Sequence, residues 1–193
     1  ATGINYRDVL TVLGSMPATP ATLQWLGGEC SGYVTAVGDN VSVYQVGDPV
    51  IAYCRGAYTS HINVDVERVF DLPDGVCMED AAGIPIVFMT ADYGLIKQAQ
   101  LQAGERVLIH SAAGGVGLAA LQIAQAVGAE IYATAGTAEK RNYLKALGIE
   151  HVFDSRSLDF YDEVMAASDN QGVDVVLNSL AGEFQQRSLA TLR

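Results

Sequence analysis

Positive charge is scarce in this sequence. Its 193 residues include 11 Lys and Arg against 22 Asp and Glu, which gives a formal net charge of -11 at pH 7. Nucleic acids and anionic membrane surfaces are bound through clustered cations, so we expect neither as a partner. Long apolar runs are missing as well, because no stretch approaches the roughly 20 apolar residues that span a bilayer.

Cysteine is also in short supply. Cys30, Cys54 and Cys77 lie 24 and 23 residues apart, with no CxxC pair and no run of neighbouring histidines. Three cysteines are few for a disulfide framework, and a structural zinc site needs more closely spaced ligands than these. We therefore expect neither, and we expect the chain to work in a reducing compartment, the cytoplasm.

Apolar residues are abundant, at 50% of the chain, and their pattern changes along its length. Up to residue 87, short β-type runs are separated by Gly and Pro turns, which predicts a mostly-β region. The strands expected there are Ser31 to Val37, Pro49 to Tyr53, Tyr58 to Val64 and Val69 to Leu72. The chain opens at Ala1 without an initiator methionine, so we expect this region to be N-terminally incomplete.

From residue 88 to residue 193, strand and helix patterns alternate, which predicts an α/β fold with a parallel sheet. The expected strands are Arg106 to His110, Glu130 to Ala135, His151 to Asp154 and Asp174 to Asn178. The expected helices are Gly115 to Val127, Ala138 to Leu147, Leu158 to Ala167 and Glu183 to Leu192. Two complete mononucleotide-binding halves would supply more strands, so we expect this region to be C-terminally incomplete.

A glycine-rich turn joins the first of these strands to its helix. The run from Val107 to Gly117 reads VLIHSAAGGVG, with Ala112, Gly114 and Gly117 in the positions of a dinucleotide-binding fingerprint. Glycine lets the backbone approach a pyrophosphate, whose charge suits the helix N-terminus. We expect the cofactor phosphates to lie against Ala113, Gly114, Gly115 and Val116; the alternative is a glycine-rich turn without a ligand.

The end of the second strand distinguishes NAD from NADP. Sites for NAD usually carry an acidic residue there, about 20 residues after the glycines, to bind the ribose 2'-hydroxyl. Here Ala135-Gly136-Thr137 stands instead, followed by Lys140 and Arg141. We expect Thr137 and Lys140 to hold a 2'-phosphate, with Arg156 as a second candidate cation. As the alternative, the two helix cations are simply solvated, beside Glu139.

Four motifs carry a resemblance to a known family. They are NYRDVL from Asn5 to Leu10, IPIVFMTA from Ile84 to Ala91, LIHSAAGGVG from Leu108 to Gly117, and DVVLNSLAG from Asp174 to Gly182. Together they resemble the enoyl reductase domain of a modular type I polyketide synthase, in the zinc-free, quinone-reductase-like branch of the medium-chain dehydrogenase/reductase superfamily. The resemblance covers essentially the whole chain.

This resemblance implies a fold, an activity and partners. The fold would combine part of a GroES-like substrate domain, residues 1–87, with part of a Rossmann domain, residues 88–193. The activity would be NADPH-dependent reduction of the α,β-double bond of an enoyl thioester tethered to an acyl carrier protein, beside neighbouring polyketide synthase domains. Alternatives left open are a zinc-independent quinone oxidoreductase, a cyclopropane-forming variant and a non-catalytic NADPH-binding module.

The resemblance also assigns residues. Thr90, Asn178 and Leu180 should lie near the nicotinamide and its ribose, although Thr90 could be a helix cap or interior hydroxyl and Asn178 a turn former. Gly28 takes the place of a zinc-ligand histidine of the related alcohol dehydrogenases, which implies no metal. Met16 stands where many relatives carry a suspected proton-donating tyrosine, and the other suggested donors would lie beyond Arg193, so no catalytic acid is identified.

Overall fold

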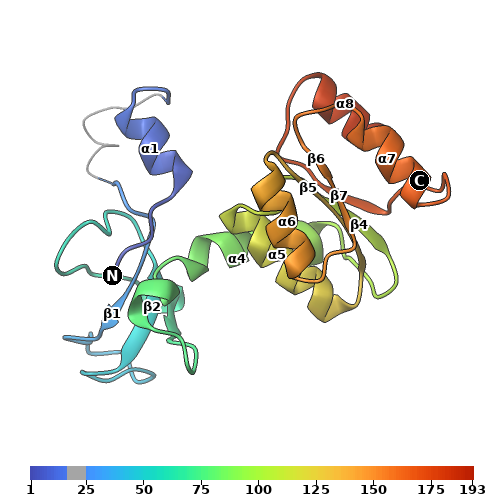
Figure 1. Cartoon of the computed structure of the whole chain (residues 1–193). Coiled ribbons are helices and arrows are strands. Elements are labelled where there is room, and N and C mark those ends of the chain that lie inside the picture. Colours follow the sequence, from blue (N-terminus) through green and yellow to red (C-terminus); the bar gives the residue numbers. More distant parts are fainter. Residues whose placement is uncertain (17–24) are drawn as a thin grey trace. The chain divides into compact units, whose positions relative to one another are not determined.

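The computed structural model describes residues 1–16 and 25–193 (Figure 1). It divides into two compact units, Ala1–Ile86 and Val87–Arg193, which are described separately below. Within the described residues, none of the helices combines the length and the apolar character needed to cross a membrane. The sequence-based domain assignment, with its substrate and cofactor roles for residues 1–87 and 88–193, stays a prediction.

The first unit is built on a small antiparallel sheet. Its strands are ordered β1-β2-β3, with Cys30 opposite Ala52 and Ile51 opposite Phe70. A buried carboxylate anchors this sheet to the helices around it, because Glu29 accepts hydrogen bonds from Asn5 Nδ2 (2.8 Å) and from the backbone N–H of Ile86 (2.7 Å). The elements are α1 (Tyr6–Val12), β1 (Glu29–Tyr33), β2 (Pro49–Tyr53), η1 (Val66–Arg68), β3 (Val69–Asp71), α3 (Met78–Ala81) and the start of α4 (Ile84–Asp92).

Two of the strand predictions for this unit need correction. The first strand begins at Glu29 and ends at Tyr33, because the chain that faces it turns away at Gly47, where φ is +98°. The segment 58–64 is not a strand in the described part of the chain. Its alternating side chains favour an extended backbone, but a strand also needs a partner ladder. Instead, the Tyr58 hydroxyl donates to the Asp8 carboxylate at 3.2 Å.

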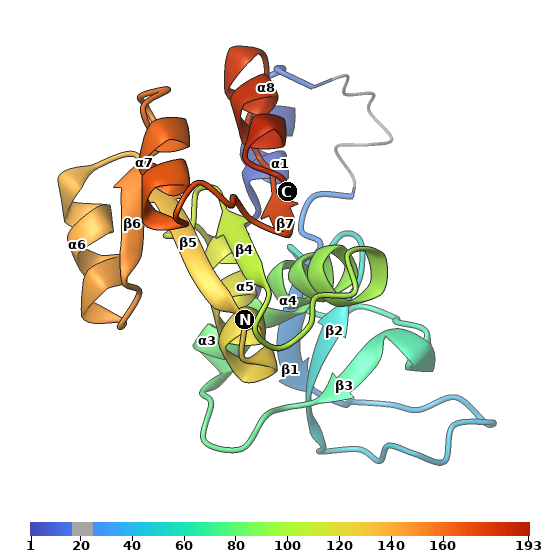
Figure 2. The ribbon, with the colours of Figure 1, turned by 90° about the vertical axis from the view of Figure 1, so that its right-hand side faces the viewer.

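The second unit is a parallel sheet with strands in the order β6-β5-β4-β7, as Figure 2 shows. The chain steps outward from β4 to β5 and β6, then crosses back to place β7 on the other side of β4, which is the order of a Rossmann-type half with one further strand. The predicted strands and helices are confirmed to within two residues at each end. They are β4 (Arg106–Ile109), α5 (Gly115–Val127), β5 (Glu130–Ala135), α6 (Ala138–Ala146), β6 (His151–Asp154), α7 (Phe160–Ala167), β7 (Val175–Leu177) and α8 (Glu183–Ala190), preceded by the rest of α4 and by η2 (Tyr93–Gln98).

Strand β4 is buried on both faces, as its continuous apolar run predicts. Val107, Leu108 and Ile109 are each 0% exposed. Val107 and Ile109 belong to a core that contains the apolar side chains of α5, whereas Leu108 belongs to a second core with Phe160 of α7. The helices therefore cover both faces of the sheet, and the polar loops at the strand ends are the places left open for a ligand.

Candidate functional site

The loops after β4 and β7 lie side by side at the carboxyl edge of the sheet. The backbone N–H of His110 donates to the carbonyl of Leu177 at 3.2 Å, and the Ser179 hydroxyl donates to Ser111 Oγ at 3.2 Å. Between β4 and β7 the strand order reverses, and open α/β sheets bind their ligands at such a point. This edge of the second unit is therefore the candidate site.

The glycine loop after β4 has the geometry of a phosphate cradle. Gly114 has extended backbone angles as the N-cap of α5, and its N–H donates to the carbonyl of Ser111 at 2.9 Å. A β-carbon at Gly117 would lie 2.5 Å from both the Ala112 Cα and the Ser111 carbonyl oxygen. Glycine is therefore required there, because it lets the first turn of α5 pack directly against the loop.

The start of α5 fits an anionic group. Gly114 and Gly115 are not buried, and the first turn of the helix contains no acidic residue. Its first N–H groups have no acceptor within the helix and lie at the positive end of the helix dipole. Added β-carbons at Gly114 and Gly115 would already meet protein atoms at 3.2 Å and 3.1 Å, so the bare backbone is what this loop offers to a ligand. These residues fit the pyrophosphate of a dinucleotide.

At the end of β5, Thr137 caps α6 and one of the two helix cations is already engaged. The Thr137 side chain accepts from the backbone N–H of Lys140 at 3.3 Å. Arg141 donates to the carbonyl of Ala135 at 3.0 Å and forms an ion pair with Asp154 at 2.9 Å. Arg141 therefore supports the β5–β6 edge, whereas the exposed Lys140 ammonium forms no ion pair within residues 1–16 and 25–193.

Arg156 lies against the end of β5. Its Nε is 3.0 Å from the position that a β-carbon at Gly136 would take, so glycine makes room for the guanidinium. The side chain is exposed and, in the part of the chain that the structure describes, has no carboxylate partner. The sequence ranks Arg156 behind Lys140, but the structure places Arg156 directly at the strand end where a ribose-binding carboxylate would otherwise stand.

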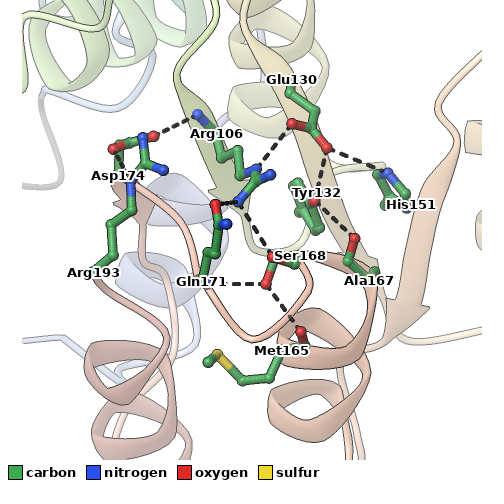
Figure 3. A network of polar contacts seen from close by, with 11 residues as sticks. Arg106, Glu130, Tyr132, His151, Met165, Ala167, Ser168, Gln171, Asp174 and Arg193 are labelled. Carbon is green, nitrogen blue, oxygen red and sulfur yellow. Dashed lines mark hydrogen bonds and ion pairs between the residues drawn. The ribbon is translucent and has the colours of Figure 1, made fainter.

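At the opposite edge of the sheet, Arg106 and Arg193 are both paired with carboxylates. Figure 3 shows Arg106 bound to Glu130, with Asp174 bridging the Arg106 backbone and the Arg193 guanidinium. Burial alone would raise the pKa of Glu130, but hydrogen bonds from Tyr132 and Arg106 outweigh it and lower that pKa. This network stabilises the amino ends of the strands, and it leaves the exposed cations Lys140 and Arg156 at the carboxyl ends.

Two residues assigned to the nicotinamide end have local structural roles as well. Asn178 donates through Nδ2 to the Leu180 carbonyl at 2.9 Å and accepts the Leu180 N–H through Oδ1 at 3.1 Å. Asn178 therefore forms a turn, which is the alternative role given to it in the sequence analysis. This turn fixes the loop after β7. Thr90 lies exposed inside α4, not at its cap. Contact of Thr90, Asn178 or Leu180 with a cofactor stays a prediction.

The sequence alone does not predict that His110 is buried and hydrogen-bonded through both ring nitrogens. His110 is 3% exposed, with Nδ1 at 3.0 Å from Thr134 Oγ1 and Nε2 at 2.8 Å from Ser188 Oγ. Burial lowers the pKa of His110 to about 4, so the ring is neutral near pH 7. The adjacent Ser111 hydroxyl is exposed and bonded to Ser179 instead, so the pair does not form a nucleophile with its base.

In the first unit, Gly28 and Met16 stand at the positions where the resemblance notes a missing zinc-ligand histidine and a missing tyrosine. Of the described residues, no three His, Cys, Asp or Glu side chains are grouped so that they could hold a metal ion. Glu29, next to Gly28, is committed to its bonds with Asn5 and Ile86. Met16 is 37% exposed, and its thioether has no proton to donate.

Comparisons with known proteins agree with this geometry. Residues 1–77 match the family model "Alcohol dehydrogenase GroES-like domain", and residues 115–193 match "Zinc-binding dehydrogenase". The chain is 47% identical over 192 residues to a phenolphthiocerol/phthiocerol polyketide synthase of Mycobacterium tuberculosis, covering 100% of this chain but only 9% of that protein's length.

Solved structures with the same fold are close in sequence too. The crystal structure of CurK enoyl reductase matches with a TM-score of 0.91 and 48% identity, over 99% of this chain and 60% of that one. The CurF cyclopropanase of the curacin A biosynthetic pathway matches with a TM-score of 0.89 and 39% identity, over the same shares of the two chains. Because these matches cover 99% of this chain, they include both the GroES-like and the Rossmann-type region expected from the sequence.

Proposed function

Because the chain belongs to the enoyl reductase domains of polyketide synthases, in the medium-chain dehydrogenase/reductase superfamily, we propose that it is an NADPH-dependent enoyl-thioester reductase. Its substrate would be an α,β-unsaturated thioester tethered to an acyl carrier protein. Neighbouring domains of a larger cytoplasmic synthase would be its other partners, as suits a chain that spans 9% of its polyketide synthase relative.

One observation carries the cofactor proposal: the glycine loop at the β4/β7 switch point lies beside the end of β5, where Ala135-Gly136-Thr137 carries no carboxylate and the cations Lys140 and Arg156 are exposed. A dinucleotide pyrophosphate would lie against Ala113 to Val116 and bind the N–H groups of Gly115 and Val116, because the Gly114 N–H already donates to Ser111. Its 2'-phosphate, which carries close to two negative charges, would bind Arg156 and Lys140. Asp154, the nearby carboxylate, is already paired with Arg141 at 2.9 Å and so repels a phosphate less.

The proposed reaction adds a hydride to the β-carbon of the thioester and a proton to its α-carbon. When bound, the nicotinamide cofactor supplies the hydride. The chain would bind the cofactor through the glycine loop, fix the loop after β7 through the Asn178 turn, and keep water out. Reduction of a conjugated double bond needs no Lewis acid, in keeping with Gly28 at the zinc-ligand position. We assign no proton donor, since Met16 cannot fill that role.

The test measures NADPH oxidation with a crotonyl thioester, presented on pantetheine and on an acyl carrier protein, and determines the mass of the product. A saturated thioester supports the proposal, with faster turnover on the carrier protein. Turnover of a quinone alone would assign the chain to the quinone oxidoreductases. A cyclopropane formed from a substrate with a halomethyl group on its β-carbon, in which the α-carbon displaces the halide after hydride addition, would assign it the activity named for CurF. NADPH binding without any turnover would make it a non-catalytic module.

A further inference from the structure

His110 connects three elements of the second unit just before the glycine loop. It directly follows β4, and its two ring nitrogens reach Thr134 of β5 and Ser188 of α8. The ring also meets Phe160 of α7 edge to face, with centroids 5.1 Å apart and planes at 84°. A buried polar ring with both nitrogens bonded holds its neighbours in one arrangement.

The hydrogen-bond network assigns one tautomer to this ring. The Ser188 hydroxyl donates its single hydrogen to the carbonyl of Phe184 at 2.7 Å. Ser188 Oγ can therefore only accept from His110, so Nε2 carries the ring hydrogen. In a neutral ring Nδ1 is then an acceptor, and it receives the Thr134 hydroxyl. His110 is thus a donor toward α8 and an acceptor toward β5.

Backbone bonds from the same region reach both loops of the site. The N–H of His110 donates to Leu177, the last residue of β7, at 3.2 Å. The N–H of Ala112 donates to the carbonyl of Thr134 at 2.9 Å. Helix α8, held by Ser188, directly follows the loop 178–182. One buried side chain therefore contacts the segments that precede the glycine loop and follow the loop after β7.

We propose that His110 is a positioning residue of the cofactor site: by tying α8 to β4 and β5, it sets the spacing between the glycine loop and the loop 178–182. This inference rests on the proposed function, in which these loops hold the phosphate and nicotinamide portions of NADPH. Because His110 is 3% exposed, the proposed effect acts through these loops and not through direct contact with a ligand or substrate. Loss of the His110 side-chain hydrogen bonds would let the loop 178–182 move. It would weaken only the contacts with the nicotinamide half of NADPH.

The experiment compares two ligands by calorimetry on the full chain. NADPH spans both loops, whereas 2',5'-ADP carries the adenosine, the 2'-phosphate and one pyrophosphate phosphorus but lacks the nicotinamide half. For His110→Phe, which keeps a ring beside Phe160 and removes both hydrogen bonds, we expect NADPH to bind about five- to tenfold more weakly. The affinity for 2',5'-ADP should stay within about twofold of wild type.

Two further variants keep the inference testable if His110→Phe does not fold. Ser188→Ala removes the acceptor at the other end of the bond and should cause the same selective loss. His110→Gln, whose amide can still donate to Ser188, should restore most of the NADPH affinity. Thr191→Val is the matched control, since its buried hydroxyl donates only to the Ser188 carbonyl at 2.7 Å, and it should leave both affinities unchanged.

The outcomes separate the two proposals. A wild-type chain that binds neither ligand would overturn the proposed function. A wild-type chain that binds both, with His110→Phe and Ser188→Ala weakening the two ligands equally or not at all, would overturn the positioning role and leave the proposed function standing. A purely structural role of His110 predicts such an equal change, because loss of folded protein affects both ligands alike.

Discussion

The guanidinium of Arg156 lies over Gly136, with its Nε 3.0 Å from the place where a β-carbon at residue 136 would be. Glycine at the end of β5 leaves room for this close approach. In sites for NAD, the same strand end carries a carboxylate that binds the ribose 2'-hydroxyl. At this strand end the chain has no negative side chain but has space for a positive one. The first two predictions follow from this difference.

Removal of Arg156 should reduce the preference for NADPH. A well-placed charge-assisted contact is worth roughly 1.5 to 3 kcal/mol, so Arg156→Ala should weaken NADPH binding at least about tenfold while changing NADH binding little. Lys140→Glu should act in the same direction. The affinities are measured by fluorescence titration of both cofactors at one fixed salt concentration, since ionic strength alone alters such contacts.

Lys145→Ala is the control for this pair of variants. Lys145 is an exposed cation in the last turn of α6, at the opposite end of the helix from Thr137, so its loss should leave the ratio of the two affinities unchanged. If Arg156→Ala retained the wild-type ratio, Arg156 would have no part in the site and Lys140 would remain as the candidate cation.

A carboxylate at residue 136 should reverse the preference. Gly136→Asp restores the ribose-binding group and meets the flexible end of the Arg156 side chain, which can turn away into solvent. The aspartate would repel a 2'-phosphate and accept a hydrogen bond from a 2'-hydroxyl. We expect NADH to bind more tightly than NADPH in this variant, measured by the same titration. Gly136→Asn, similar in size but uncharged, separates the effect of charge from that of shape and should leave NADPH preferred.

Gly117 should tolerate no side chain. A β-carbon there would lie 2.5 Å from backbone atoms of Ser111 and Ala112, which cannot rotate away as a side chain can. Gly117→Ala should therefore cost about 1 to 3 kcal/mol of stability and displace the cradle, so that NADPH binding falls by at least about tenfold. Thermal unfolding and calorimetric titration measure the two effects.

Gly32→Ala is the control, because nothing lies within 4 Å of its added β-carbon. It should leave cofactor affinity unchanged. An unaltered affinity in Gly117→Ala would instead mean that the close approach of helix and loop is not needed for binding.

The α/β half was predictable from sequence because its signals are local. Continuous apolar strands such as Val107 to Ile109, and a glycine turn that opens a helix, fix element type and order without tertiary information. The β half was less predictable: the pattern from Tyr58 to Val64 records side-chain preference, whereas a strand also requires a neighbouring ladder from elsewhere in the chain. Helix α4 was missed as an element because its apolar run IPIVFM has no polar face to reveal a helical period.

Within the site, the sequence identified the residue types but not their partners. Lys140 and Arg141 are equivalent cations in the sequence, and only the structure shows that Arg141 is bound to Asp154. Arg156 is 20 residues after Gly136, so its approach to that glycine depends on the pairing of β5 with β6. The roles of Ser188 and Thr134 are equally non-local, since they lie 78 and 24 residues from His110.

His110 also makes the free energy of unfolding depend on pH, over the range between 6.5 and about 4. Burial lowers its pKa from 6.5 to about 4, so between these values the unfolded chain binds a proton that the folded chain does not. The contribution of the neutral ring is complete above pH 6.5 and is lost as the pH falls toward 4. From pH 7 to pH 5, the free energy of unfolding should fall by about 2 kcal/mol on this account. The carboxylates of Glu130 and Asp174, whose pKa values are lowered in the folded chain, act only below their ordinary values of 4.5 and 3.8.

The measurement is denaturant unfolding of wild type and His110→Gln at pH 7, 6 and 5. Gln retains a donor toward Ser188 but does not titrate, so its stability should be lower at pH 7 and should change less with pH. The two curves should therefore converge as the pH falls, because acid removes from the wild type an advantage that the variant never had. Parallel curves across this range would show that the ring is protonated in the folded chain or reached by solvent. The assignment of a neutral ring with hydrogen on Nε2 alone would then be wrong, although the bond to Ser188 would remain, because a protonated ring also donates through Nε2.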